Sequence, residues 1–581
     1  MPESKHKVIS KEDFQKVLKV KGFHGRLLSS WGMRIMKFDK LNDLYDKAYD
    51  KDSTVFVENC LRLMNINLTV SESDLNNIPE SGPVVFLFNH PYGGLDALAI
   101  MLSVLKRRPD TKFLANFLLS RVEPVAHHLI SVNPFESHKE AFSSLAGLKE
   151  MYKVIESGGA ICILPAGEVS TKYGKSKVVE DRDWHINVMK FVKKVNAPVV
   201  SGFVSGQNSK LFHIVGKINP SLRTVRLPAE LLNKKNRNIF IRFSAPLQPK
   251  IINNIEDKNT LAKVLKARTY CLNDQESTGA EVKPTVNYQD IVKALDTNLI
   301  KSEIEKIKKT DLLFTTDNYE CYFSEHDNIP VIFDELTRLR EIAFREIGEG
   351  TGKEKDFDKF DSYYNHLFLW DSAASMLVGS YRIGMGADII KDKGIAGFYL
   401  NSLFEFKDDF KSYLGKSMEM GRSFIVPEYQ RKPLPLFLLW KGIYHVTQKF
   451  PDYKYLIGPA SISSLYSDNA KILIVEYLKR NHNWPELSTM VKFRKGFNYT
   501  SNHHHEILLS TFEHDLNTID RLIKDIDFNH FGIPVLIKKY LSLGGKILCF
   551  NVDPDFNYTV DGLVVLDIDV VSQEVINSYN K

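Results

Sequence analysis

Short runs of consecutive apolar residues recur through the first half of the chain, and they constrain its fold more than any other feature. Strands that are apolar on both faces are typical of a sheet that helices cover on both sides. The pattern therefore predicts an α/β layer with a buried sheet. The apolar runs are 84–88, 160–164, 198–204 and 239–243, and helical patterns such as 142–157 and 184–195 separate them.

The second half of the chain shows the same alternation after a polar segment, "LNDQESTGAEVKPTVNYQD", at 272–290. A helical pattern spans 331–348, and apolar runs follow at 366–371, 376–384, 453–462 and 546–552. A chain of 581 residues has room for several domains. We predict a helical segment over 1–75, an α/β domain over 76–270, a linker over 271–295 and a second α/β domain over 296–581.

The sequence lacks several features that would indicate a secreted, membrane-spanning or zinc-binding protein. The five cysteines form no C-x-x-C pair, no stretch approaches 18 consecutive apolar residues, and the start lacks the apolar region of a secretory signal. The net charge of +6 is mild, does not call for nucleic acid, and suits an anionic membrane surface or an acidic carrier protein. We expect a cytoplasmic protein without a bound metal or cofactor, and a solvated turn at the histidine triplet 503–505.

A basic and apolar stretch, "GRLLSSWGMRIMKF" at 25–38, interleaves Arg26, Arg34 and Lys37 with large apolar residues. A helix of this composition can lie on a membrane surface. It can equally pack on its own domain.

The sequence "NHPYGGLD" at 89–96 breaks the first apolar strand and precedes an apolar helix. Gly93 and Gly94 allow a sharp turn, so His90 and Asp96 could meet at the edge of the sheet, where α/β sites usually form. An aspartate bonded to one histidine nitrogen fixes the tautomer and stabilises the cation, so the pair can deprotonate a hydroxyl. Alternatively, Asp96 caps the helix and His90 is a satisfied turn histidine.

A second block, "ICILPAGEVS" at 161–170, follows another apolar strand. With "NHPYGGLD" before it and "ISVNPF" at 130–135 between them, residues 60–260 resemble the glycerolphosphate/lysophospholipid acyltransferase family. The resemblance implies that His90 is the general base and Asp96 its orienter, with a thioester of acyl carrier protein or coenzyme A as acyl donor. It implies substrate contacts at Asn89, Gly93, Gly94, Asn133, Pro165, Gly167 and Glu168.

The chain departs from that family at two points. Five residues rather than four separate His90 from Asp96, and Val169 stands where the family has an arginine. Both changes suit the hemolysin-like branch, which acylates hydroxyls other than that of glycerol phosphate.

The second half places charged residues on otherwise apolar segments. Such charges are costly in a core unless they pair with one another, so we expect an Arg/Asp/Glu network lining a cleft. Scattered surface charge is the alternative. The set comprises Arg340 and Phe344 on a helix, Asp358 and Asp361, Arg382 at a strand end, and Glu419 and Arg422 before Ser423.

This set resembles the acyl-homoserine-lactone synthase branch of the GNAT fold, and more closely the ornithine N-acyltransferase family, over residues 320–560. The resemblance implies an amine acceptor, Glu419 as its candidate base, and a backbone N–H beside Ser423 or Gly458 for the thioester oxygen. "QRKPLPL" at 430–436 lacks the glycines that cradle a coenzyme A pyrophosphate. Acyl carrier protein, which is acidic, could instead meet Arg431 and Lys432.

The whole chain resembles bifunctional enzymes that make ornithine lipids or similar aminolipids. The expected function is N-acylation of ornithine, glycine or a similar amino acid with a 3-hydroxyacyl thioester, followed by O-acylation of the 3-hydroxyl. The expected location is the inner face of a bacterial cytoplasmic membrane, with peripheral contact. Two alternatives remain: a lysophospholipid (1-acylglycerol-3-phosphate) acyltransferase with an accessory GNAT-like domain, and a non-catalytic module that binds a carrier protein or a membrane.

Overall fold

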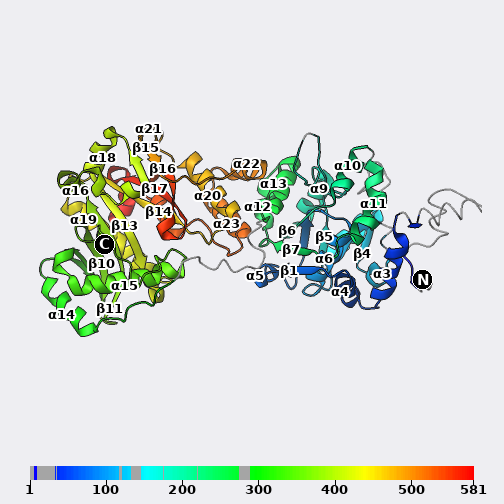
Figure 1. Ribbon diagram of the computed structural model, residues 1–581, viewed down its shortest axis with the longest axis horizontal. Helices are drawn as coiled ribbons and strands as arrows, with labels where there is room; N and C mark the ends of the chain where they lie inside the picture. The colour runs from blue at the N-terminus through cyan, green and yellow to red at the C-terminus, as the bar shows by residue number, and fades with distance from the viewer. Residues whose placement is uncertain are drawn as a thin grey trace, which may run out of the picture. The chain divides into compact units, whose positions relative to one another are not determined.

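The computed structural model describes residues 6–8, 33–34, 36–116, 119, 121–132, 145–174, 176–218, 220–273 and 288–580. The chain divides into two compact units (Figure 1). The first unit comprises residues 1–279 together with 502–511, and the second comprises 280–501 with 512–581. Most of the predicted linker, 274–287, lies outside the described residues.

The first unit contains a seven-stranded sheet in the order β1-β7-β6-β2-β5-β3-β4. All neighbouring strands are parallel except β6 and β7, which are antiparallel. The strands are β1 (Asn67–Val70), β2 (Val84–Phe88), β3 (Lys112–Asn116), β4 (Leu129–Val132), β5 (Ala160–Ile163), β6 (Val199–Val204) and β7 (Asn238–Phe243). The helices are α3 (Phe38–Ala48), α4 (Ser53–Leu63), α5 (Glu72–Asn76), α6 (Gly94–Leu105), α7 (Glu123–Ala126), α8 (Leu145–Glu156), α9 (Ile186–Val195), α10 (Lys210–Ile218), α11 (Pro220–Leu232), α12 (Pro249–Asn254), α13 (Lys258–Tyr270) and α22 (His503–Phe512).

The four predicted strands of this unit are confirmed as β2, β5, β6 and β7, and three of them are buried throughout. The expectation that residues 1–75 are helical is wrong for Asn67–Val70. These four residues form β1, which pairs with β7 at the edge of the sheet. A four-residue strand is too short for its own pattern to be distinguished from the end of a helix.

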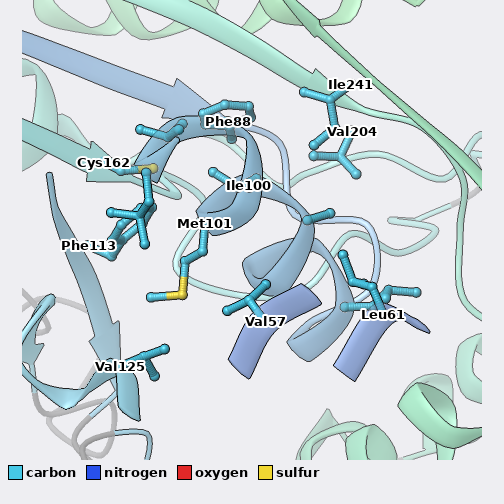
Figure 2. Packing of buried hydrophobic residues seen from close by; sticks show 14 of the residues in the cluster. Val57, Leu61, Phe88, Ile100, Met101, Phe113, Val125, Cys162, Val204 and Ile241 are labelled. Carbon is cyan, nitrogen blue, oxygen red and sulfur yellow. The ribbon is translucent and has the colours of Figure 1, made fainter. Parts of the chain in front are cut away.

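The core of the first unit lies between the sheet and the paired helices α4 and α6. Val84, Phe86 and Phe88 alternate onto this face of β2 and belong to the same buried cluster as α6. In Figure 2, Ile100 and Met101 of α6 lie between the strands and α4. Burial on both faces of β2 leaves its carboxyl end as the place where polar residues emerge.

The second unit contains an eight-stranded sheet in the order β16-β17-β14-β13-β11-β10-β9-β8. Helix α15 packs on β11 and β13, and α19 packs on β9, β10 and β11. The strands are β8 (Leu312–Thr316), β9 (Tyr319–Glu325), β10 (Asn365–Asp371), β11 (Met376–Met385), β13 (Ser417–Ile425), β14 (Tyr455–Ile462), β16 (Lys546–Asp553) and β17 (Thr559–Asp567), with β12 (Phe404–Phe406) and β15 (Val491–Phe493) in a separate pair. The helices are α14 (Thr297–Ile307), α15 (Pro330–Glu346), α16 (Gly386–Lys393), α17 (Leu400–Leu403), α18 (Lys411–Gly415), α19 (Pro433–Lys449), α20 (Asp468–Asn481), α21 (Pro485–Ser488), α23 (Leu516–Ile526), α24 (Val535–Ser542) and α25 (Gln573–Asn580).

Strands β13 and β14 are the only parallel neighbours in this sheet, within the described residues 288–580, and they pair over just three positions. The pairs run from Ser417 opposite Tyr455 to Glu419 opposite Ile457. Beyond them, the rest of β13 pairs with β11 and the rest of β14 pairs with β17. The two central strands therefore diverge, and backbone groups of both strands are left without a ladder partner on the facing edges.

Candidate active sites

His90 lies in the turn between β2 and α6. Asn89 and His90 directly follow the strand, and the predicted helix begins at Gly94. Gly93 has a φ of 102°, a backbone conformation that glycine adopts without strain. A Cβ on Gly93 would lie 2.9 Å from a methyl group of Leu227 on α11, so the turn also lacks space for a side chain there.

Asp96 holds the imidazole of His90 through one carboxylate oxygen. Nδ1 of His90 lies 3.0 Å from Oδ2 of Asp96, and the same oxygen accepts the backbone N–H groups of Tyr92 and Gly93. The carboxylate is fully buried, whereas the histidine side chain is 16% exposed. Asp96 thus caps the helix and orients the histidine at the same time. The capping role and the orienting role, which the sequence offered as alternatives, are compatible.

The charge of Asp96 also sets the proton affinity of His90. Burial alone would lower the pKa of His90, but the nearby carboxylate of Asp96, with a smaller contribution from Asp181, raises it above the ordinary value. With Nδ1 engaged, Nε2 is the nitrogen left to exchange a proton with a substrate. The geometry is that of a histidine–aspartate pair suited to general base catalysis.

Asp181 is a residue of this site that sequence reasoning missed. Its Oδ1 accepts the backbone N–H of His90 at 3.1 Å and the hydroxyl of Ser170 at 2.6 Å, and its Oδ2 accepts Nε1–H of Trp184. The carboxylate therefore ties the His90 turn to the "PAGEVS" loop. Asp181 lies in no motif, and it is 91 positions from His90, so nothing in the sequence indicated that the two residues are in contact.

The other predicted residues of the first block lie around this pair. Asn89 exchanges two hydrogen bonds with the backbone of Val204, so it fixes the strand end rather than offering a free amide. Pro165 accepts the N–H of His185 at its carbonyl, and Gly167 has a φ of 68°. Asn133 lies outside the described residues.

Glu168 lies beside the His90 turn, because the N–H of Ser170 donates to the carbonyl of His90 at 2.8 Å. Its carboxylate accepts hydrogen bonds from Arg182 at 3.2 Å, Arg223 at 3.1 Å and the Tyr173 hydroxyl at 3.2 Å. The site thus contains two arginines, although Val169 occupies the position of the family's arginine.

In the second unit, Arg340 of α15 forms the centre of the predicted charge network. It donates from Nη1 and Nη2 to the two oxygens of Asp361, at 3.1 and 3.0 Å, and its Nε lies 2.7 Å from Asp356. Nη1 of Arg382 lies 3.1 Å from Asp361. Burial alone would raise the pKa of Asp361, but the two guanidinium groups hold it far below its usual range.

Asp358 links the other two arginines of the network. It accepts from Arg382 at 2.6 Å and from Arg422 at 2.8 Å, and Nε of Arg422 lies 3.0 Å from Asp356. The three arginines and three aspartates are therefore mutually paired. Asp358 and Asp361 were predicted partners of these arginines, and Asp356 joins them.

Arg422 occupies an unusual backbone conformation at the point where β13 leaves β14. Its φ is 50°, and the ladder between β11 and β13 shifts register between Ser380 and Arg382. Such an irregularity re-aims a side chain. The Arg422 guanidinium lies 4.3 Å from the ring centre of Phe556, which contacts Phe344 edge-on. The predicted Arg340/Phe344 pair thus belongs to the same cluster.

Glu419 lies beside the arginine network rather than within its ion pairs: the Arg382 guanidinium lies 5.2 Å from the ring centre of Tyr364, and its charge acts on the Glu419 carboxylate. Its side chain is 1% exposed, and it accepts hydrogen bonds from the Tyr364 hydroxyl and from the N–H of Leu400. Burial raises the pKa of Glu419 to about 7 despite these hydrogen bonds. The carboxylate can exchange a proton near neutral pH, and Tyr364 is the hydroxyl in contact with it.

Gly458 directly follows the last paired residues of β13 and β14, and Ser423 lies farther along β13. A Cβ on Gly458 would lie 2.2 Å from the carbonyl oxygen of Met420, so the two strands are still close at Gly458 and diverge beyond it. Arg431 and Lys432 are exposed directly before α19, and Nζ of Lys432 lies 3.8 Å from the ring centre of Tyr429.

Two further carboxyl groups of the second unit, one of them within the electrostatic reach of Arg422, were missed by sequence reasoning. Burial raises the pKa of Glu349 to about 8, with a contribution from Asp561, and burial raises the pKa of Asp561 itself to about 7. Asp561 accepts from the hydroxyl of Ser461 on β14 at 2.6 Å. Neither Glu349 nor Asp561 belongs to a sequence motif.

The expectation of a solvated turn at the histidine triplet is wrong. Residues 503–505 begin α22, and His504 and His505 are buried. Nε2 of His504 lies 3.2 Å from Oε2 of Glu180, and with His503 the three potential metal-ligand atoms lie within 4.8 Å of one another. Lys266 lies 3.6 Å from the same carboxylate oxygen and already supplies a positive charge there.

Family models match parts of both units. Residues 15–279 match the family model described as "Acyltransferase", and residues 339–440 match the model described as "Acetyltransferase (GNAT) domain". Domains of both kinds use acyl thioesters as co-substrates. The matches agree with the placement of His90 in the first unit and of the charge network in the second.

Individual relatives are similar to parts of the chain. A glycine N(alpha)-acyltransferase of Bacteroides thetaiotaomicron is 29% identical over 283 residues, which are 46% of this chain and 82% of the relative. A lyso-glycine lipid O-acyltransferase of Phocaeicola vulgatus is 25% identical over 40% of this chain and 85% of its own length. An L-ornithine N(alpha)-acyltransferase of Agrobacterium fabrum is 29% identical over 42% of this chain and 77% of its own length.

These matches define an enzyme of the acyltransferase class. The protein joins an N-terminal acyltransferase domain to a C-terminal GNAT domain, which confirms the predicted α/β fold class and the predicted fusion. Among the described residues, no helix has both the length and the apolar character needed to cross a bilayer.

Proposed function

We propose that this chain makes a diacylated amino-acid lipid in two successive acyl transfers. The GNAT domain joins a 3-hydroxyacyl group to the α-amine of an amino acid, and the N-terminal domain then esterifies the 3-hydroxyl. We propose glycine as the amino acid, with ornithine as the alternative to be distinguished by experiment.

One observation carries this proposal. The same chain is similar to a glycine N(alpha)-acyltransferase and to a lyso-glycine lipid O-acyltransferase, each along more than four-fifths of that relative's length. The names of these two relatives describe consecutive reactions, since the product of the first is a monoacyl glycine lipid. The two sites also lie in different units, so each reaction has its own residues.

In the O-acyl transfer, His90 is proposed to accept the proton of the 3-hydroxyl at Nε2. The hydroxyl oxygen forms a bond to the thioester carbonyl carbon, the carbon–sulfur bond breaks, and the departing thiolate takes the proton from His90. Asp96 stabilises the imidazolium that exists between these proton transfers, because its carboxylate lies 3.0 Å from Nδ1.

In the N-acyl transfer, the amine nitrogen is proposed to form a bond to the thioester carbonyl carbon where β13 and β14 diverge. The carbon–sulfur bond breaks, and the departing thiolate takes up the proton that the amine gives to the protein. Backbone N–H groups near Ser423 and Gly458 would stabilise the charge on the carbonyl oxygen. Glu419 is the proposed proton acceptor. It acts through a bonded group such as the Tyr364 hydroxyl, because its own carboxylate is buried.

Acyl carrier protein is the proposed donor for the GNAT domain. A helix N-terminus binds a pyrophosphate through its free backbone N–H groups, and Pro433 and Pro435 remove two of them from the first turn of α19. The exposed Arg431 and Lys432 would meet an acidic carrier. Peripheral membrane contact at the inner face of a bacterial membrane is part of the proposal, although most of the stretch 25–38 lies outside the described residues.

Reconstitution with purified full-length protein tests the proposal. Isotopically labelled glycine, a 3-hydroxyacyl thioester and a second acyl thioester should give labelled N-acyl glycine first and the N,O-diacyl product later. Labelled ornithine in a parallel reaction reports the choice of amino acid. If the protein acylates lysophosphatidate but neither amino acid, the lysophospholipid acyltransferase alternative replaces this proposal.

A further inference from the structure

Two arginines from different parts of the first unit converge on Glu168. Nη1 of Arg182 lies 3.2 Å from Oε1, and Nη2 of Arg223 lies 3.1 Å from Oε2 of that carboxylate. The side chains of Arg182, Arg223 and Glu168 are 37%, 13% and 27% exposed, respectively. The three side chains are therefore partly buried and partly accessible to solvent.

Helix α11 brings Arg223 to the catalytic turn. Leu227 and Leu231 of this helix pack against the positions of Gly93 and Gly94, at 2.9 and 3.5 Å from the Cβ that each glycine lacks. Arg223 lies one helical turn before Leu227, so both residues lie on the same face of the helix. The guanidinium is thereby held next to the turn that carries His90.

The neighbouring helix makes room for the Arg223 side chain. A Cβ on Gly216 of α10 would lie 2.4 Å from Cδ of Arg223, so the arginine stem passes where only a glycine fits. The Glu168 loop is fixed to the same turn, since Ser170 donates its N–H to the carbonyl of His90. Both sides of the cluster are thus positioned relative to the histidine.

The cluster carries an excess of positive charge and of hydrogen-bond donors. Two guanidinium groups face one carboxylate, which leaves a net charge of about +1. Each guanidinium has five N–H donors in a planar fork, and a single carboxylate with the Tyr173 hydroxyl cannot engage all of them. Planar, bidentate recognition of a carboxylate or phosphate is the chemistry for which arginine is best suited.

We propose that Arg223, assisted by Arg182, binds the carboxylate of the acceptor and so selects an N-acyl amino acid for O-acylation at His90. This inference rests on the proposed function. In that function the acceptor carries one free carboxylate besides its reactive hydroxyl. Val169 provides no positive charge at the position where the family has an arginine. Arg182 and Arg223, which lie outside the "PAGEVS" block in the sequence, supply positive charge there instead. Glu168 holds both guanidinium groups in place before the acceptor arrives.

The test compares two acceptors that differ only in charge. The purified full-length enzyme is assayed for O-acylation of N-(3-hydroxyacyl)glycine and of the matching N-(3-hydroxyacyl)glycinamide with the same acyl thioester. The wild-type protein should favour the acid over the amide by about 10- to 100-fold in kcat/KM, the range expected for a charge-assisted hydrogen bond. Arg223→Ala should abolish this preference, chiefly by raising KM for the acid.

Matched variants keep the result interpretable. Arg226→Ala removes an arginine of the same helix that pairs with Glu230 at 3.3 Å, and it should leave the preference intact. Arg182→Ala, at a more exposed position, should weaken the preference partially. Arg223→Lys should restore only part of it, because lysine lacks the planar fork.

The results distinguish a failure of the carboxylate-binding inference from a failure of the proposed function. Equal kcat/KM for acid and amide in the wild-type protein, or an unchanged preference in Arg223→Ala, overturns the inference while the proposed function stands. Acylation of lysophosphatidate without acylation of either glycine compound overturns the proposed function and this inference together.

Discussion

Replacing Asp96 by asparagine should separate the two roles of this residue. Asparagine keeps the shape and an oxygen that can accept the N–H groups of Tyr92 and Gly93, but it removes the negative charge 3.0 Å from Nδ1 of His90. At that distance and an effective dielectric constant of about 20, the attraction between imidazolium and carboxylate is about 5 kcal/mol. Most of it acts when His90 holds the substrate proton, so we expect O-acyl transfer to fall by about 10²- to 10⁴-fold.

The pH dependence of the same variant gives a second, independent signature. In the wild-type protein, activity should fall as pH drops through the raised pKa of His90, because the cation cannot accept a proton. Without the charge of Asp96, burial lowers that pKa, so the acidic limb of the profile should move to lower pH while the plateau falls. A variant that is merely unfolded loses rate without moving the limb.

The assay is O-acylation of a supplied monoacyl acceptor, measured as kcat/KM against pH. N-acylation of the amino acid by the GNAT domain of the same preparation serves as the control and should be unchanged. The reasoning is refuted if Asp96→Asn retains activity within threefold of wild type, or if its acidic limb stays in place or moves to higher pH.

Three further changes test the second unit. Asp361→Asn leaves two buried guanidinium groups without a full counter-charge, so it should lower the free energy of unfolding in urea by about 3–5 kcal/mol. The control Asp327→Asn changes a carboxylate that is 92% exposed and should be neutral. A loss below about 1 kcal/mol for Asp361→Asn would contradict the stabilising role of the network. N-acylation should decline as pH drops through about 7, where Glu419 becomes protonated, and Glu419→Gln should remove that limb along with most of the activity; a limb that persists in the variant excludes Glu419 as its origin. Charge reversal at both Arg431 and Lys432 should raise KM for acyl carrier protein thioesters but not for coenzyme A thioesters, and equal effects on both donors would argue against carrier docking.

Much of the fold was predictable because burial leaves a strong pattern. Strands β2, β5 and β6 are buried on both faces, so their sequences are continuous apolar runs that no surface element would carry. The His90–Asp96 pair was predictable for a local reason, since both residues lie in one turn. Strand β1 was missed because a four-residue edge strand contributes little burial of its own.

The parts of the sites that were missed depend on contacts between distant segments. Asp181 reaches His90 from 91 positions away, and Arg223 reaches Glu168 from 55 positions away. Neither lies in a motif, and their partners follow only from how the loops and α11 fold over the turn. Glu419 was predicted by its spacing from Arg422, yet its partner Tyr364 depends on the packing of β10 against its neighbours.

The most direct test of the account is the lipid composition of a bacterial host that makes no aminolipids and expresses this protein. Mass spectrometry of lipid extracts should show an N,O-diacyl amino acid with the wild-type chain, and only the N-acyl compound with His90→Ala. Glu419→Gln should remove both products. Continued formation of the diacyl lipid by His90→Ala, or the absence of both lipids with the wild-type chain, would contradict the claim that one chain performs two acyl transfers at two separate sites.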